Sequence, residues 1–126
     1  MKPADIRQKA EIAISSAKAL LALGDTDGAS NRAYYAMFDI ARAALMEINA
    51  PLSMRAAKTH KGLISAFSLY LVKPGILTPQ LGQALSRAFE IRIWADYTGD
   101  AVSFEYAETL VGDASIFLEE VAKRVF

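Results

Sequence analysis

The sequence predicts an all-α protein, an up-and-down bundle of four main helices plus a shorter one. Apolar residues recur every three or four positions over most of the chain, which is the period of an amphipathic helix. Short breaks rich in Gly, Pro, Asp or Ser divide the chain into segments of helical length. No segment shows the sustained alternation of apolar and polar residues, bounded by hairpin turns, that is typical of strands.

The first predicted helix ends at Gly24-Asp25, and its apolar positions keep helical spacing: Ile6, Ala10, Ala13, Ile14, Ala17, Leu20 and Leu21. The second runs from Asp27 to about Asn49 and stops before Pro51, which cannot donate the next backbone hydrogen bond. This helix carries two apolar stripes: Ala29, Ala33, Ala36 and Ile40 on one face, and Tyr34, Phe38, Ala41, Leu45 and Ile48 on another. We therefore expect it to be buried on both sides.

The third predicted helix runs from Thr59 to about Val72 and ends before Lys73-Pro74-Gly75. In the fourth, the Thr78 hydroxyl is the expected N-cap and Pro79 the first helical residue. The apolar pattern of this helix runs through Leu81, Leu85, Ala88, Phe89 and Ile91 to Ala95. Ser103 is expected to cap the last helix, whose apolar residues alternate by three and four like a heptad seam: Phe104, Ala107, Val111, Ala114, Leu118, Val121 and Val125. The second helix, which is apolar on two faces, and the seam of the last helix predict a homodimer.

Composition narrows the class of protein. A chain of 126 residues matches one domain, which we place at 1–126. The absence of cysteine excludes disulfides and thiolate sites, and the charged N-terminus and lack of a long apolar run predict a cytoplasmic protein with no membrane segment. The balance of 14 basic and 14 acidic residues argues against strong sequence-blind attraction to nucleic acid, although it leaves room for a local basic patch. One histidine and scattered carboxylates predict no metal site, and no cofactor motif is present.

The first polar cluster lies inside the second predicted helix. Arg32, Tyr35 and Asp39 stand at i, i+3 and i+7 and line one face, with Asn31 beside them. They can present a guanidinium, a phenol and a carboxylate to one ligand. They can equally form an internal ion pair that sets the helix register.

The second cluster lies near the end of the fourth helix. Arg92 and Asp96 are four residues apart, and Tyr97 follows. The guanidinium can bind phosphate oxygens or pair with Asp96, and both interpretations stay open. Trp94 points elsewhere, so we assign it to the core or to an interface.

His60 is the one histidine of the chain, at the start of the third helix. It can act as an acid, a base or a phosphate ligand, or it can be a surface or capping group. Arg55, Lys58 and Lys61 around it form a local basic cluster, to which the amides of a helix N-terminus add partial positive charge.

Three strings in this order resemble the HEPN family, the higher eukaryotes and prokaryotes nucleotide-binding domains. They are Ser30-Asn31-Arg32-Ala33-Tyr34-Tyr35-Ala36-Met37-Phe38 with Ala41-Arg42-Ala43, then Thr59-His60-Lys61-Gly62-Leu63, then Arg92 with Ala95-Asp96-Tyr97. The resemblance covers nearly the whole chain. It implies a bundle of four main helices with short extra ones, usually as a homodimer. Prokaryotic relatives are often encoded beside a small nucleotidyltransferase, as a toxin–antitoxin or substrate-binding pair.

Many relatives are metal-independent ribonucleases that use an arginine followed, after four to six residues, by a histidine. Here the corresponding positions after Arg92 hold Tyr97, Thr98 and Gly99. Without an imidazole, the proton transfers of RNA cleavage lack their usual carrier, at a cost of about 10²–10⁴-fold per group. His60 can replace it only if the fold brings it beside Arg92.

Three functions follow as hypotheses. The first is a noncatalytic protein that binds a nucleotide, RNA or a nucleotidyltransferase partner through a face with Arg32, Asp39, Arg92 and Asp96. The second is a ribonuclease toxin with a variant site built from Arg92, Asp96, Tyr97 and His60. The third is a helical interaction module whose polar clusters only stabilise a dimer.

Overall fold

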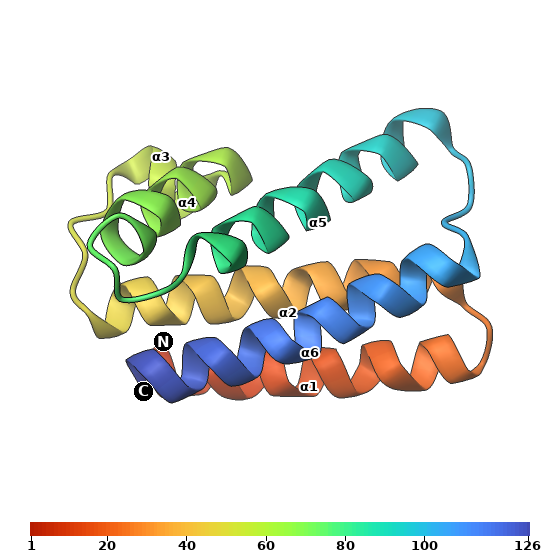
Figure 1. Ribbon diagram of the computed structural model, residues 1–126, viewed down its shortest axis with the longest axis horizontal. Coiled ribbons are helices and arrows are strands. Elements are labelled where there is room, and N and C mark those ends of the chain that lie inside the picture. The colour runs from red at the N-terminus through yellow and green to blue at the C-terminus, as the bar shows by residue number, and fades with distance from the viewer.

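The computed structural model is built from helices only, as predicted (Figure 1). It describes the backbone of residues 1–126 and every side chain except that of Arg55, and the described chain contains no strand. The four long helices are α1 (Pro3–Ala22), α2 (Thr26–Glu47), α5 (Pro79–Thr98) and α6 (Phe104–Val125). Between α2 and α5 lie α3 (Met54–Lys58), α4 (His60–Phe67) and a π-helical turn, η1 (Ser68–Val72).

The shorter predicted helix corresponds to α4 and η1 together. The chain widens into a π-helical turn without leaving the helix, and the Lys73 amide donates to the Ser68 carbonyl at 2.8 Å. The sequence did not predict α3, because five residues carry too little periodicity to be recognised. The hydroxyl of Ser53 accepts a hydrogen bond from the Ala56 amide and so starts this helix.

The helix ends follow local chemistry at most positions. The Ser103 hydroxyl caps α6 by accepting from the Tyr106 amide, as predicted. Thr78 occupies the N-cap position of α5, but its side chain makes no capping hydrogen bond, so that part of the prediction was wrong. Pro79 has no N–H and already has a helical φ, which starts the helix without a side-chain cap. At the other end, Gly99 adopts a φ of 70°, which lets the chain leave α5 without side-chain strain.

Helices α1, α2 and α6 pack as one layer of three. In Figure 1 α2 and α6 run in the same direction, and α1 runs opposite to both. Small residues meet where α1 packs on α2, and all of them are buried: Ala10, Ala13 and Ala17 from α1, and Ala29, Ala33 and Ala36 from α2. The prediction that α2 is buried on both sides is confirmed, because Tyr34, Ala41 and Leu45 of its other stripe are also buried.

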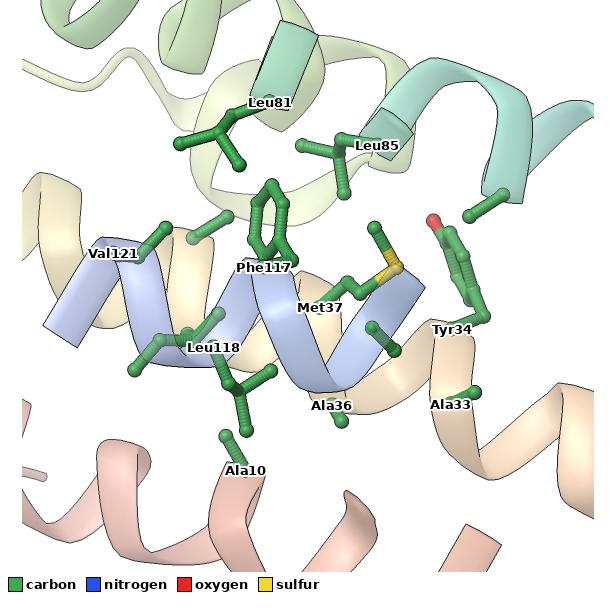
Figure 2. Packing of buried hydrophobic residues seen from close by; sticks show 14 of the residues in the cluster. Ala10, Ala33, Tyr34, Ala36, Met37, Leu81, Leu85, Phe117, Leu118 and Val121 are labelled. Carbon is green, nitrogen blue, oxygen red and sulfur yellow. The ribbon is translucent and has the colours of Figure 1, made fainter. Parts of the chain in front are cut away.

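Helix α5 lies across α2 and α6 on the side away from α1 (Figure 1). Figure 2 shows Phe117 of α6 pointing toward Leu81 and Leu85 of α5. Ala88 is the last buried residue of α5, so the second half of this helix leaves the core. Trp94 lies in that half and is 49% exposed, so it is not a core residue. No described helix combines the length and apolar character that crossing a bilayer requires.

Candidate functional site

The site begins with the position of His60 at the first turn of α4. Thr59 caps this helix, and its hydroxyl accepts from the Gly62 amide at 3.0 Å. His60 is therefore the first helical residue, and its half-buried ring turns toward α2 and α5. Its centroid lies 4.6 Å from that of Phe38 and 5.9 Å from that of Phe89. The imidazole is thus held in an aromatic cluster.

A hydrogen bond joins His60 to Tyr34 of α2. The Tyr34 hydroxyl and His60 Nδ1 are 2.7 Å apart, and their rings stack with centroids 5.5 Å apart. Figure 2 shows the Tyr34 hydroxyl directed away from its own helix, toward α5. Burial raises the pKa of Tyr34 well above its ordinary value, so the phenol keeps its proton at neutral pH. When this hydroxyl donates, Nδ1 is the acceptor and the hydrogen of the neutral ring lies on Nε2.

Arg92 of α5 joins the same cluster. Its guanidinium carbon lies 4.8 Å from the ring centroid of Tyr35 and 5.6 Å from that of Tyr34, within the range of cation–π contacts. Arg92 also pairs with Asp96 at 3.9 Å, but that carboxylate is 69% exposed and the pair contributes little to stability. The two tyrosine rings are therefore the main support of the guanidinium.

In this arrangement burial lowers the pKa of His60, and the positive charge of Arg92 lowers it further. With its pKa held below 6.5, the imidazole is mainly neutral at pH 7. The fold thus brings an arginine and a histidine together although they are far apart in the sequence and lack the usual spacing.

The predicted cluster around Asp39 is arranged differently. The nearest ion-pair partner of Asp39 is Arg42, at 3.8 Å, so the hypothesis of an internal Arg32–Asp39 pair assigned the wrong arginine. Burial raises the pKa of the Asp39 carboxyl, against the opposing effects of Lys9, Arg42 and Arg32. Since Lys9 belongs to α1, Asp39 faces charges of the α1–α2 pair, whereas Tyr35 contacts Arg92.

The other predicted residues lie around the cluster. Lys58 ends α3 and Lys61 follows His60 in α4, and both side chains are exposed. The Arg55 side chain lies outside the described residues. Tyr97 is 90% exposed and points to solvent rather than into the cluster.

Asn31, Arg92 and Asp96 line a cavity of about 230 Å³ between the start of α2, the end of α5 and the start of α6. Its other polar walls are Asp27, Ser30 and Asp100. Sequence reasoning missed these three residues, although Asp27, Ser30 and Asn31 share one helix face at i, i+3 and i+4. It also assigned Tyr34 only to the core, where a phenol needs a hydrogen-bond partner.

The cluster of Arg92, His60 and the two tyrosines offers hydrogen-bond donors to a ligand. A guanidinium and the Nε2–H of a neutral imidazole can each donate to an anionic group, and aromatic rings lie beside them. Among the described residues, no group of three His, Asp or Glu side chains is placed to hold a metal ion.

Comparison with known proteins agrees with this architecture. A family model described as the HEPN domain matches residues 4–125. "Putative toxin MJ0605" of Methanocaldococcus jannaschii is 34% identical over 114 residues, covering 90% of this chain and 81% of that protein. "Putative toxin MJ0142" of the same organism is 30% identical and covers 92% of this chain and 76% of its own length. A UPF0332 protein of Thermotoga maritima is 32% identical, with 94% of this chain and 87% of the relative covered. The chain belongs to the HEPN domain family.

Proposed function

We propose that this toxin-like HEPN protein binds the phosphate groups of RNA or of a nucleotide at Arg92 and His60. The observation that carries the proposal is the meeting of these two side chains on the rings of Tyr34 and Tyr35. A guanidinium held between aromatic rings and an acidic neighbour keeps donors that suit phosphate oxygens.

Nearby aromatic surface favours a nucleic acid or nucleotide over a simple anion. Tyr35 and Phe38 are half-buried and lie against His60, with ring centroids 6.0 and 4.6 Å away. Unpaired bases stack on such rings, typically with about 1–3 kcal/mol per base. Lys58 and Lys61 add exposed positive charge beside the histidine.

The state of His60 supports binding rather than turnover. When Tyr34 donates to Nδ1, the lone pair of that nitrogen is occupied and Nε2 carries the hydrogen. Neither nitrogen then offers a free lone pair to take the proton of a ribose 2′-hydroxyl. The imidazole serves as a hydrogen-bond donor in this state.

Titration of a fluorescently labelled single-stranded RNA, and separately of AMP by calorimetry, tests the proposal. Arg92→Ala is expected to weaken binding about tenfold or more, as loss of a charge-assisted hydrogen bond does, and to lower the slope of log affinity against log salt by about 1. Arg87→Ala removes an exposed arginine from the same helix and is the matched control. Equal affinities of the two variants, or no binding by the parent protein, contradict the proposal.

A second candidate function is RNA cleavage at a variant site. Its specific support is the position of His60 beside Arg92, because the imidazole expected after the arginine in sequence is supplied here from another helix. Cleavage requires that RNA binding break or reverse the Tyr34–His60 hydrogen bond, because only then does a ring nitrogen become free for proton transfer. Purified protein that leaves labelled RNA intact, and growth arrest that persists in Arg92→Ala, exclude this alternative.

We further propose that the protein works as a homodimer with a nucleotidyltransferase-type antitoxin partner. Two relatives are named putative toxins, which supports a paired system. Sedimentation at micromolar concentration tests the dimer, and a monomer contradicts it. Copurification with the product of an adjacent nucleotidyltransferase gene tests the pair, and a locus without such a gene counts against it.

A further inference from the structure

A second surface lies where α5 leaves the core and joins α6, and it is acidic. Residues 93–122 contain seven of the 14 acidic residues of the chain and no lysine or arginine. Asp96, Asp100, Glu105 and Glu108 of this stretch are exposed. Such a surface repels RNA and anionic lipids and attracts cationic groups.

Exposed aromatic residues accompany this charge. Trp94 and Tyr106 are 49% and 63% exposed and line one groove, which also holds Ile91 and Val102. A concentration of large apolar side chains at the surface is typical of protein contact sites. Ile91 and Val102 also line the 230 Å³ cavity described above, so the aromatic groove and the cavity are neighbours.

Negatively charged side chains outnumber positively charged ones in the wall of the cavity. Asp27, Asp96 and Asp100 contribute three carboxylates against the single guanidinium of Arg92. Asp27 uses one carboxylate oxygen to accept from the Val102 amide at 2.8 Å, which ties the loop before α6 to α2 and forms the cavity wall. The Ser30 side chain lines the same cavity, is only 7% exposed, and its hydroxyl has no hydrogen-bond partner among the described residues. A buried polar group without a partner is costly unless a ligand or water satisfies it.

From these contacts we infer that the junction of α5 and α6 is a docking surface for a basic segment of a partner protein, which inserts an arginine into the cavity and lays an apolar residue on Trp94 and Tyr106. A guanidinium has five donors in a planar fork and suits several acceptors spread around a cavity better than an ammonium does. The volume is sufficient, since a cavity of about 150 Å³ already holds benzene. The cavity shares Arg92 with the phosphate-binding cluster, but three carboxylates outnumber that guanidinium in its wall, and the inference does not depend on the proposed phosphate binding.

The arginine pocket is tested with N-acetyl-arginine amide as the probe and N-acetyl-citrulline amide, its uncharged isostere, as the control. We expect saturable NMR shifts of the Ser30 and Asn31 amides with the first probe only. Asp100→Asn should weaken binding about tenfold, through loss of a charge-assisted hydrogen bond, while Glu119→Gln removes the same charge elsewhere on the acidic stretch and should change little. Equal binding of citrulline, shifts centred on Lys58 and Lys61, or no saturation overturns the inference.

The docking surface is tested with the dipeptide N-acetyl-Trp-Arg amide. It should bind several-fold more tightly than the arginine probe, and Trp94→Ala should remove this gain without weakening the arginine probe. An affinity equal to that of arginine alone shows a small-molecule pocket instead and overturns the docking surface. Self-association that is lost in Asp100→Asn, measured by sedimentation, shows that a second copy of the chain is the occupant and also overturns it.

Discussion

The hydrogen bond between Tyr34 and His60 joins a buried phenol to a half-buried imidazole across 26 positions of sequence. It holds the ring in one orientation, and when Tyr34 donates, Nε2 carries the hydrogen of the neutral ring. Arg92 lies on the same tyrosine, so a change at any of these three residues alters the surroundings of the others. Effects of substitutions in this cluster should therefore not be additive.

The dependence of stability on pH provides a test at the residue scale. The pKa of His60 is lowered from 6.5 because burial, and then the charge of Arg92, disfavours the imidazolium. The unfolded chain therefore binds a proton more readily than the folded protein. The contribution of His60 to stability is complete above pH 6.5 and is lost as the pH falls through its pKa in the folded state.

Urea denaturation at about pH 7.5 and about pH 5.5 measures this contribution. We expect the free energy of unfolding to fall less on acidification in His60→Gln than in the parent protein. Asp39 is present in both proteins, so its own titration cancels in the comparison. An equal fall in both proteins contradicts the assigned environment of His60.

At the scale of elements, close packing of α1 on α2 depends on small side chains. Ala10 of α1 has no exposed surface, and Figure 2 shows it beside Leu118 of α6, so no space remains for a larger residue. This is the point at which all three helices of the layer approach one another.

Ala10→Leu should therefore destabilise the protein by about 1–3 kcal/mol, because an overpacked core forces side chains and backbone to shift. Ala19→Leu makes the same change on the exposed side of α1 and should alter the free energy of unfolding by no more than about 0.5 kcal/mol. Thermal and urea unfolding of both variants measure the difference. Similar values for the two positions contradict this account of the helix contact.

On the scale of the whole molecule, Phe117 of α6 connects the layer of α1, α2 and α6 to α4 and α5. Its ring stacks on that of Phe67 at the end of α4, with centroids 5.5 Å apart, and points toward Leu81 and Leu85 of α5 (Figure 2). Both phenylalanines are fully buried. Helix α4, which carries His60, and helix α5, which carries Arg92, thus both pack against Phe117.

Phe117→Ala should lower the free energy of unfolding by about 3–5 kcal/mol through the cavity it leaves. Phe104→Ala, in the half-exposed first turn of α6, should cost less than about 1 kcal/mol. Because α4 and α5 lose their common support, the Phe117 variant should also weaken RNA binding under conditions in which it remains folded. A variant with normal RNA affinity and normal stability contradicts this role.

Periodicity and end signals predicted the four long helices, the Ser103 cap and the burial of α2 on both sides. These features depend on neighbours within about one turn, and such interactions act whatever the rest of the chain does. The same local pattern overestimated the burial of the second half of α5. Ile91 to Ala95 continue an apolar run, but burial depends on whether another helix covers it, and none of the described helices covers Trp94 fully.

The candidate site was predicted as separate parts. Arg92, His60 and Tyr35 could be singled out because polar groups in apolar helices are costly without partners. Which of them meet was decided by the way α4 and α5 pack on α2, since a small change of crossing angle moves a side chain by several ångströms. For the same reason only the folded protein shows that Asp39 pairs with Arg42, and that Ser30, whose hydroxyl is buried, lines a cavity with three carboxylates.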